Sequence, residues 1–256
     1  MRLLFWNTHN AKINNIIACA VRSMHIDFII LAEYKDDVIE LCNLTGMRKY
    51  ASIGCEEIFM FGFQDNVDIG EQDSRFSFQI IGGQYILGGI HLPSRMYDGH
   101  QTRRNIVIQK IIDAVRRHET DLGTKKTIIV GDFNEDPYEA GCLSAMNFFG
   151  LPYVSLKDTR IIERTEFEKF YNPMWNLFGD FSNPPGTYFY NESNPNGSYW
   201  HIFDQVMIRP CLRKSFKEES LKIITVIGAT NLLADNGKPD TQISDHLPIV
   251  FEIKEG

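Results

Sequence analysis

The sequence predicts an α/β protein in which two mixed β-sheets pack face to face with helices on their outer surfaces. Short runs of apolar, β-branched residues recur in both halves of the chain, and amphipathic segments at helical spacing lie between several of them. No linker of altered composition separates the halves. At 256 residues the chain can bury a large core. We therefore expect a single domain that spans residues 1–256.

Each expected element rests on its own pattern. Helices are expected where apolar residues recur on one face, and strands where β-branched and aromatic runs end on turn residues such as Gly82 and Gly83. Residues 165–181 mix aromatic and charged side chains and predict a short helix packed over the sheet. The expected strands cover residues 2–7, 26–32, 56–63, 75–81, 84–92, 127–130, 187–190, 200–208, 221–227 and 248–253, and the main helices cover residues 13–24, 36–44, 101–118 and 138–149.

The stretch Gly131-Asp132-Phe133-Asn134 directly follows a buried strand of β-branched residues. Alternate side chains of an extended segment point the same way, so Asp132 and Asn134 should face one spot. Oxygen atoms at a strand end suit a hard cation such as Mg²⁺ or Mn²⁺, or a water molecule that is positioned for attack. A solvated Asp-x-Asn turn would give the same pattern.

Polar residues also end other expected strands. Taken singly each has an ordinary explanation, because a strand-end Asn commonly forms a turn, a lone His is commonly structural and a lone Asp is commonly solvated. Their combination and their order along the chain are more specific. The set consists of Asn7, Glu33, His91, Asp132, Asn134, Asp204, Asp245 and His246.

In this order and beside these strands, the polar residues resemble those of the endonuclease/exonuclease/phosphatase superfamily, which is typified by deoxyribonuclease I. The resemblance covers essentially the whole chain. Its most specific motifs are residues 131–134 and Ser244-Asp245-His246, supported by Asn7 and by Leu31-Ala32-Glu33. It implies a four-layered α/β/β/α sandwich with the active site at one end, and divalent-metal-dependent hydrolysis of a phosphate ester.

The resemblance also implies roles for the individual residues. Glu33 would be a direct ligand of Mg²⁺ or Mn²⁺, with Asn7 and Asp245 close by, since Mg²⁺ needs few carboxylates besides water. Asp132 and Asn134 would orient or deprotonate the attacking water and hold a phosphate oxygen.

The histidines complete the implied site. His246 and Asp204 would form a pair in which the carboxylate fixes the imidazole tautomer and stabilises its charged form, whether the pair acts as base or holds the phosphate. His91 would donate to a non-bridging oxygen or assist the leaving group. The metal and the histidines would act mainly by electrostatic stabilisation. Which group is the general base stays open.

Four further residues are candidates for substrate binding. Lys35 lies two positions beyond Glu33 and could reach a phosphate or be a solvated loop lysine. Arg103 and Arg104 fall in the first turn of an expected helix, where the helix dipole disfavours a cation, so at least one of them should face an anion; a plain surface role is the alternative. Trp200 could stack on a base or belong to the strand core.

The sequence departs from the family pattern at several places. Gln205-Val206 follows Asp204 where many relatives carry an aromatic and an aliphatic residue. His91 stands where abasic-site endonucleases carry tyrosine, which argues against abasic-DNA repair. Residues 170–175 either shape substrate choice or pack their aromatic side chains into the core, and the Asn-rich residues 191–198 form either a solvated loop or a substrate contact.

Composition limits the cellular location and the binding partners that the protein can have. The formal net charge of -7 excludes the basic field of a non-specific nucleic-acid coat, although bound cations and a basic rim can still attract nucleic acid. The 5 scattered cysteines include no CxxC pair, which favours reduced thiols in a cytosol over disulfides or a zinc site. No apolar run approaches the length of a membrane span. We expect a cytoplasmic protein without stable membrane association.

These observations together predict a Mg²⁺- or Mn²⁺-dependent phosphodiesterase that acts on nucleic acid. One alternative keeps the chemistry and changes the substrate to a phosphoinositide or another small phosphate ester; lipid substrates rank lower because no basic amphipathic segment is evident. Another alternative is a non-catalytic binding module of the same fold, which would normally have lost a metal ligand or the histidine–aspartate pair.

Overall fold

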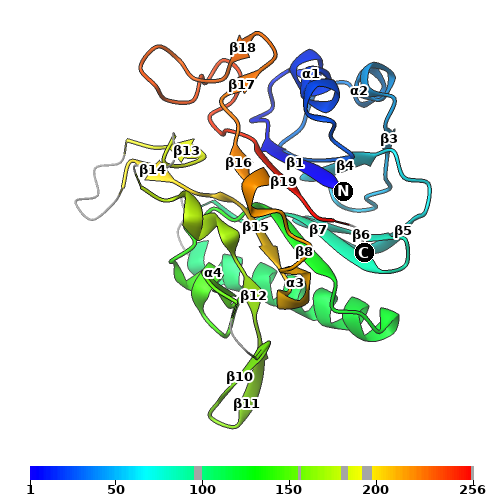
Figure 1. Cartoon of the computed structure of the whole chain (residues 1–256), viewed down its shortest axis with the longest axis vertical. Coiled ribbons are helices and arrows are strands. Elements are labelled where there is room, and N and C mark those ends of the chain that lie inside the picture. The colour runs from blue at the N-terminus through cyan, green and yellow to red at the C-terminus, as the bar shows by residue number, and fades with distance from the viewer. Residues whose placement is uncertain (95–99, 155–156, 180–183, 192–197, 255–256) are drawn as a thin grey trace.

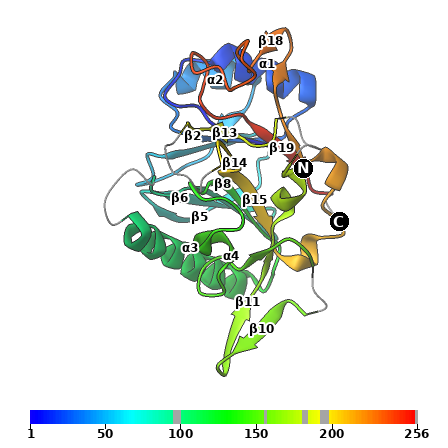
Figure 2. The ribbon, with the colours of Figure 1, turned by 90° about the vertical axis from the view of Figure 1, so that its left-hand side faces the viewer.

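Two β-sheets stack face to face in the computed structural model, which describes the chain except for residues 95–99, 155–156, 180–183, 192–197 and 255–256. Figure 2 shows four successive layers, in which helices cover the outer surface of each sheet. The four-layered α/β/β/α sandwich expected from the sequence is confirmed.

Within the described chain, one sheet has six strands and the other has seven (Figure 1). The six-stranded sheet runs in the order β16 (Lys222–Ile223), β19 (Ile249–Glu252), β1 (Arg2–Asn7), β2 (Phe28–Ala32), β4 (Ile58–Gly62) and β3 (Arg48–Lys49). The seven-stranded sheet runs in the order β5 (Val67–Asp73), β6 (Phe76–Ile81), β7 (Tyr85–His91), β8 (Thr127–Asp132), β15 (Asp204–Ile208), β12 (Phe170–Tyr171) and β9 (Gly150–Leu151).

Helices and small strand pairs surround the sheets. The α-helices are α1 (Asn14–Met24), α2 (Val38–Thr45), α3 (His100–Leu122) and α4 (Ala140–Leu143), and short 3₁₀ segments span Pro173–Leu177, Pro210–Leu212 and Glu218–Ser220. The separate strand pairs are β10 (Thr159–Ile162) with β11 (Thr165–Glu168), β13 (Tyr188–Phe189) with β14 (Trp200–His201), and β17 (Val226–Ile227) with β18 (Thr230–Asn231).

Three apolar clusters hold the layers together. Phe5 and Val130 belong to the cluster between the sheets, whereas Leu4 packs under α1 and Ile129 packs under α3. Because successive strand residues face opposite sides, a strand in the middle of a four-layered sandwich is buried on both faces. Burial on both faces explains why these strands appear in the sequence as continuous runs of apolar residues.

Pairing registers carry polar residues to one end of the sandwich. Strand β7 runs parallel to β8 with His91 opposite Asp132, and β15 runs antiparallel to β8 with Asp204 opposite the same residue. In the other sheet, parallel pairing of β1 with β2 sets Asn7 opposite Ala32, immediately before Glu33. The registers of the two sheets therefore determine which polar side chains can meet.

The prediction of a helix at residues 138–149 is correct only for about one turn and is wrong for the residues that follow. Helix α4 ends at Leu143, since Ser144 adopts an extended conformation and its hydroxyl accepts a hydrogen bond from the backbone N–H of Met146. Serine competes with helical hydrogen bonding in this way, which favours a turn.

The helix expected within residues 165–181 is also wrong, and residues 180–181 lie outside the described part. This segment forms β11, β12 and a 3₁₀ turn that begins at Pro173, where the side chain of Asn172 accepts a hydrogen bond from the N–H of Met174. Phe170 is nevertheless buried, so the expected packing of aromatic side chains into the core holds. The hairpin of β10 and β11, which projects from the lower end in Figure 1, has no signal in the apolar pattern.

No helix among the described residues is long and apolar enough to cross a membrane. The five cysteines form no disulfide with one another.

Helix α3 is attached to β5 through His118, and this contact makes stability depend on pH. The Nε2 atom accepts a hydrogen bond of 2.9 Å from the backbone N–H of Glu71, which requires a neutral imidazole. Partial burial lowers the pKa of His118, against the opposing charge of Glu71. The unfolded chain therefore binds the proton more readily than the folded chain. The stabilisation is complete above the unfolded pKa of about 6.5 and is lost as the pH falls from that value through the lower pKa of the folded chain.

We expect His118→Gln to flatten the dependence of the free energy of unfolding on pH, because the amide oxygen of Gln can accept the same hydrogen bond without titrating. Urea denaturation at about pH 7.5 and about pH 5.5 measures this for both proteins. An equal loss of stability on acidification in the wild type and the variant would contradict the assignment to His118.

Candidate active site

A cavity of about 680 Å³ lies where β1, β2, β7 and β8 present their carboxyl ends. Most of the residues that the sequence predicted for the site contribute to its wall, although they come from distant parts of the chain. Those that line the cavity are Glu33, Lys35, His91, Arg103, Asp132, Asn134, Asp245 and His246.

The loop that follows β1 fixes Glu33. The backbone N–H of Asn10 donates to the carbonyl of Glu33 at 2.8 Å, and the hydroxyl of Thr8 donates to the same oxygen at 3.0 Å. Glu33 has a φ of 49°, a left-handed conformation that side chains disfavour and that must be held by its surroundings. The conformation turns the carboxylate toward the cavity, where Nδ2 of Asn7 donates to Oε1 at 3.2 Å.

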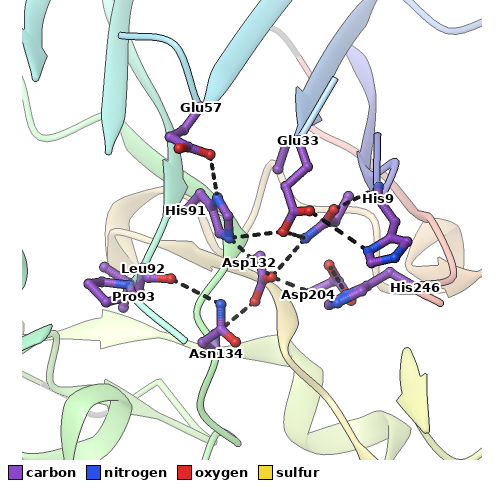
Figure 3. Close-up of polar contacts among 12 residues, drawn as sticks. His9, Glu33, Glu57, His91, Leu92, Pro93, Asp132, Asn134, Asp204 and His246 are labelled. Carbon is purple, nitrogen blue, oxygen red and sulfur yellow. Dashed lines mark hydrogen bonds and ion pairs between the residues drawn. The ribbon is translucent and has the colours of Figure 1, made fainter. Parts of the chain in front are cut away.

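Asp132 is 1% exposed and accepts hydrogen bonds from both sheets (Figure 3). The backbone N–H of Asn134 donates to Oδ1 at 2.8 Å, and Nδ2 of Asn7 donates to Oδ2 at 3.0 Å. Asn134 also donates from its amide to the carbonyl of Leu92 at 2.9 Å. The amide nitrogen of Asn7 thus joins Glu33 to Asp132, so this side chain positions two carboxylates in the orientation observed.

His246 lies between two carboxylates. Its Nδ1 atom is 2.8 Å from Oδ2 of Asp204, and its Nε2 atom is 3.9 Å from Oδ2 of Asp132. Burial opposes the charged imidazole, but the charges of Asp204 and Asp132 outweigh it and raise the pKa of His246 to about 10. Burial raises the pKa of Asp132, against the opposing charge of His246. The three groups can therefore hold a proton at the edge of the cavity.

His91 forms a second pair that the sequence motifs did not reveal. Its Nδ1 atom is 3.2 Å from Oε2 of Glu57, and its Nε2 atom is 3.5 Å from Glu33 and 3.7 Å from Asp132 (Figure 3). The hydrogen bond with His91 lowers the pKa of Glu57. Glu57 precedes β4, and a search for polar residues that follow strands overlooks it.

Glu33 and Asp245 flank His9, another residue without a sequence motif. The Nδ1 atom of His9 is 3.8 Å from Oε2 of Glu33 and 3.4 Å from Oδ1 of Asp245. Oδ1 of Asp245 is buried and has no hydrogen-bond partner among the described residues. Carboxylate oxygens at a polar cavity, one of them without a hydrogen bond, fit the ligand chemistry of Mg²⁺ or Mn²⁺.

A more compact set of possible ligand atoms consists of Asp132, Asp204 and His246, whose atoms lie within 4.8 Å of one another. Nδ1 of His246 already contacts both carboxylate oxygens of Asp204, so this nitrogen and this carboxylate are engaged with each other. The compact set therefore suits proton transfer better, and Glu33 with Asp245 suits a cation better.

The four candidate substrate-binding residues fall into two groups. Lys35 and Arg103 are exposed and line the cavity. Trp200 faces the other way, because alternate residues of β14 point to opposite sides and the neighbouring His201 lines the cavity. Its ring packs 5.4 Å from that of Phe189, beside the cluster under α1. Stacking of Trp200 on a base is therefore not supported, and the structure agrees with the other alternative, in which Trp200 packs against neighbouring side chains.

Arg104 also has a structural role instead of the predicted substrate-binding role. It is 1% exposed, its Nη1 atom donates to Oε1 of Glu135 at 2.5 Å, and its Nη2 atom donates to the carbonyl of Pro93 at 3.0 Å. The anion that the helix-dipole argument required is thus a buried carboxylate of the protein. The guanidinium holds the segment after β7 against the segment after β8 and does not face the cavity.

An aromatic wall, made of Tyr188, Tyr190 and Phe203, completes the cavity, and His201 lines the cavity beside this wall. The ring of Tyr188 is 4.6 Å from that of His246 and 5.2 Å from that of Phe203, measured between centroids. Trp200 was the aromatic residue singled out from this region of the sequence, whereas the structure turns its neighbours to the cavity. Most of the Asn-rich stretch 191–198 lies outside the described residues.

Comparison with solved structures identifies the fold. A 3' phosphatase, NExo, from Neisseria bound to a product DNA hairpin has a TM-score of 0.64 at 13% identity, with 100% of both chains covered. An AP endonuclease from Archaeoglobus fulgidus has a TM-score of 0.60 at 11% identity, also with 100% of both chains covered. An endonuclease/exonuclease/phosphatase family protein from Bacteroides thetaiotaomicron has a TM-score of 0.57 at 15% identity, over 99% of this chain and 97% of the other.

The chain has the fold of the endonuclease/exonuclease/phosphatase superfamily, the deoxyribonuclease I-like fold. This confirms the fold that the resemblance in the sequence motifs implied. No protein-family model matches the sequence, and a search of curated proteins finds no relative.

The two adjacent arginines should respond very differently to substitution. We expect Arg104→Ala to lower the free energy of unfolding by about 3–5 kcal/mol, because Glu135 would remain as an unpaired buried charge. Arg103→Ala provides the matched control and should change stability by less than about 0.5 kcal/mol, since its side chain is exposed. Urea denaturation measures both, and similar effects of the two substitutions would contradict the structural role of Arg104.

Proposed function

We propose that this protein is a divalent-metal-dependent phosphodiesterase that hydrolyses nucleic acid. The observation that supports this most strongly is the convergence of two kinds of groups in one cavity. Glu33 and Asp245 supply oxygen ligands, and His91, Asp132 and His246 supply groups that can move or donate protons. The non-catalytic alternative is disfavoured, because the expected site residues are present and lie close together.

Glu33 and Asp245 would hold Mg²⁺ or Mn²⁺, with Asn7 keeping the carboxylate of Glu33 in place. A bound cation of this type polarises the phosphate and stabilises the negative charge that develops on its oxygens. The hard carboxylate donors favour such an ion over a soft one.

Asp132 would accept the proton of an attacking water. Its carboxylate is oriented by Asn7 and Asn134, and its pKa is raised by burial, both of which suit a general base. His246 and His91 are placed to donate to non-bridging phosphate oxygens or to the leaving group. Such preorganised donors stabilise the charge of an in-line displacement.

The substrate assignment rests on the rim and the wall of the cavity. Lys35, Arg75 and Arg103 bring three cationic side chains to the cavity, which can contact phosphates beside the carboxylates that line it. The aromatic wall offers apolar ring surface on which a base or sugar can pack. Structures of similar fold include a 3' phosphatase bound to DNA. A cytoplasmic location is part of the proposal and is supported by the five free cysteines.

The test is hydrolysis of plasmid DNA, single-stranded RNA and a chromogenic phosphodiester with Mg²⁺, with Mn²⁺ and with EDTA. We expect cleavage with a divalent ion and none with EDTA. Asp132→Asn and His246→Asn should each lower kcat by about 10²–10⁴, because each removes a proton-transferring or charge-stabilising group. Asp113→Asn and His25→Asn, which change exposed residues of the same types, serve as matched controls.

Cleavage that survives in both active-site variants would contradict the site. Absence of cleavage on all three substrates would contradict a nucleic-acid phosphodiesterase. Phosphoinositide vesicles and small nucleotides would then test the alternative substrates.

A further inference from the structure

A further buried histidine–aspartate pair lies beside the aromatic wall, apart from the groups assigned to catalysis. Nδ1 of His201 is 2.7 Å from Oδ2 of Asp136, and the two side chains are 5% and 1% exposed. Asp136 also accepts hydrogen bonds from the backbone N–H of Ile202 at 2.8 Å and from the hydroxyl of Tyr138 at 3.0 Å. The carboxylate is thus fixed, and it fixes the orientation of the imidazole ring.

Nε2 is the nitrogen of this imidazole that is left for a ligand. His201 lines the cavity and Asp136 does not, while Nδ1 of His201 is engaged by Asp136. A ligand in the cavity would therefore meet His201 at Nε2.

Because Asp136 holds Nδ1 of His201, Nε2 is the ring nitrogen at which an anion can bind. Among the described residues, His201 is the one basic side chain within ion-pair distance of Asp136. A buried charge is ordinarily balanced by a partner, and an imidazole whose Nδ1 donates to a carboxylate can carry an N–H on Nε2 as well. An anion at Nε2 would then complete a carboxylate–imidazolium–anion arrangement.

Tyr188 lies between His201 and His246, because it pairs with His201 of β14 on one side and forms a β-bridge with His246 on the other. The centroid of the Tyr188 ring is 4.6 Å from that of His246 and 6.5 Å from that of His201. Phe203 stacks on His201, with ring centroids 4.7 Å apart. This side of the cavity therefore presents two imidazoles separated by apolar ring surface.

This order of groups, two imidazoles with an aromatic ring between them, corresponds to the order along a nucleic-acid strand, in which charged phosphates are separated by a less polar sugar and base. With the scissile phosphate at His246, the sugar or base would lie over Tyr188, and the next donor beside the wall is His201. We propose that His201 binds a second phosphate of the substrate, the one that neighbours the scissile phosphate along the strand. The inference rests on the proposed phosphodiesterase function and specifies a polymeric substrate for it.

The test compares a substrate that has a second phosphate with one that lacks it. A short single-stranded oligonucleotide has neighbouring phosphates, whereas bis(p-nitrophenyl) phosphate has only the scissile one. His201→Asn keeps an N–H donor near the position of Nδ1 for Asp136 and removes Nε2. His25→Asn is the matched control, because His25 is exposed at the left-handed C-cap of α1, where asparagine is tolerated.

We expect His201→Asn to raise KM for the oligonucleotide about tenfold, the loss of roughly one hydrogen bond to a charged group, with kcat little changed. The value of kcat/KM for bis(p-nitrophenyl) phosphate should stay at the wild-type level in both variants. Equal losses on the two substrates, or none on either, would overturn the second phosphate site. Failure of the wild type to cleave either substrate would overturn the proposed function itself.

Removing the charge of the neighbouring phosphate gives an independent measurement. A single methylphosphonate at that linkage should raise KM for the wild type by a similar factor and have little further effect in His201→Asn, since two changes to one contact are not additive. A full additional loss in the variant would show that His201 does not contact this phosphate.

A second variant separates binding from folding. His201→Gln places an amide near the position of Nε2 and leaves Asp136 without its donor. It should melt at a lower temperature than the wild type but retain a KM for the oligonucleotide close to the wild-type value. A stable His201→Gln variant that has lost affinity for the oligonucleotide and for bis(p-nitrophenyl) phosphate alike would contradict the inference.

Discussion

The buried carboxylate of Asp132 constrains the rest of the site. A charge at this depth needs hydrogen-bond donors, and the donors come from the other sheet through Asn7 and from the following loop through Asn134. His246 and His91 approach the same carboxylate from neighbouring segments. The packing of the two sheets and the geometry of the site are therefore coupled, since a shift of one sheet would remove a donor from Asp132.

Histidine–carboxylate pairing recurs around the cavity. His246 pairs with Asp204 and His201 with Asp136, and in each case Nδ1 contacts the carboxylate. His91 uses Glu57 in the same way. Such a partner fixes the tautomer and the orientation of the ring, so that Nε2 can be directed to a ligand. The cavity thus presents several oriented imidazole edges within an acidic protein.

Backbone strain collects in the same region. His9, Asn10, Glu33 and Asn134 have positive φ values although none is glycine. Conformations of this kind persist where the surrounding structure enforces them, and they direct a side chain to a place that a regular strand end would not reach. Hydrogen bonds from residues 8–10 to Glu33 hold the backbone of Glu33 in this conformation.

The sequence by itself determined the fold class, the main strands and most of the polar residues that line the cavity. These depend on local patterns, namely apolar runs, strand-end motifs such as Gly131-Asp132-Phe133-Asn134, and the order of motifs along the chain. The same local reasoning failed at residues 138–149 and 165–181, where serine, proline and asparagine side chains direct the backbone away from a helix.

Only the tertiary structure decided which polar side chains meet. Arg103 and Arg104 are neighbours in sequence, yet one faces the cavity and the other neutralises Glu135, because a helix turns successive residues in different directions. Likewise β14 turns His201 inward and Trp200 away. His9 and Glu57 carry no motif and join the site through contacts between segments distant in sequence. Such contacts depend on strand register and sheet packing, which a linear pattern does not encode.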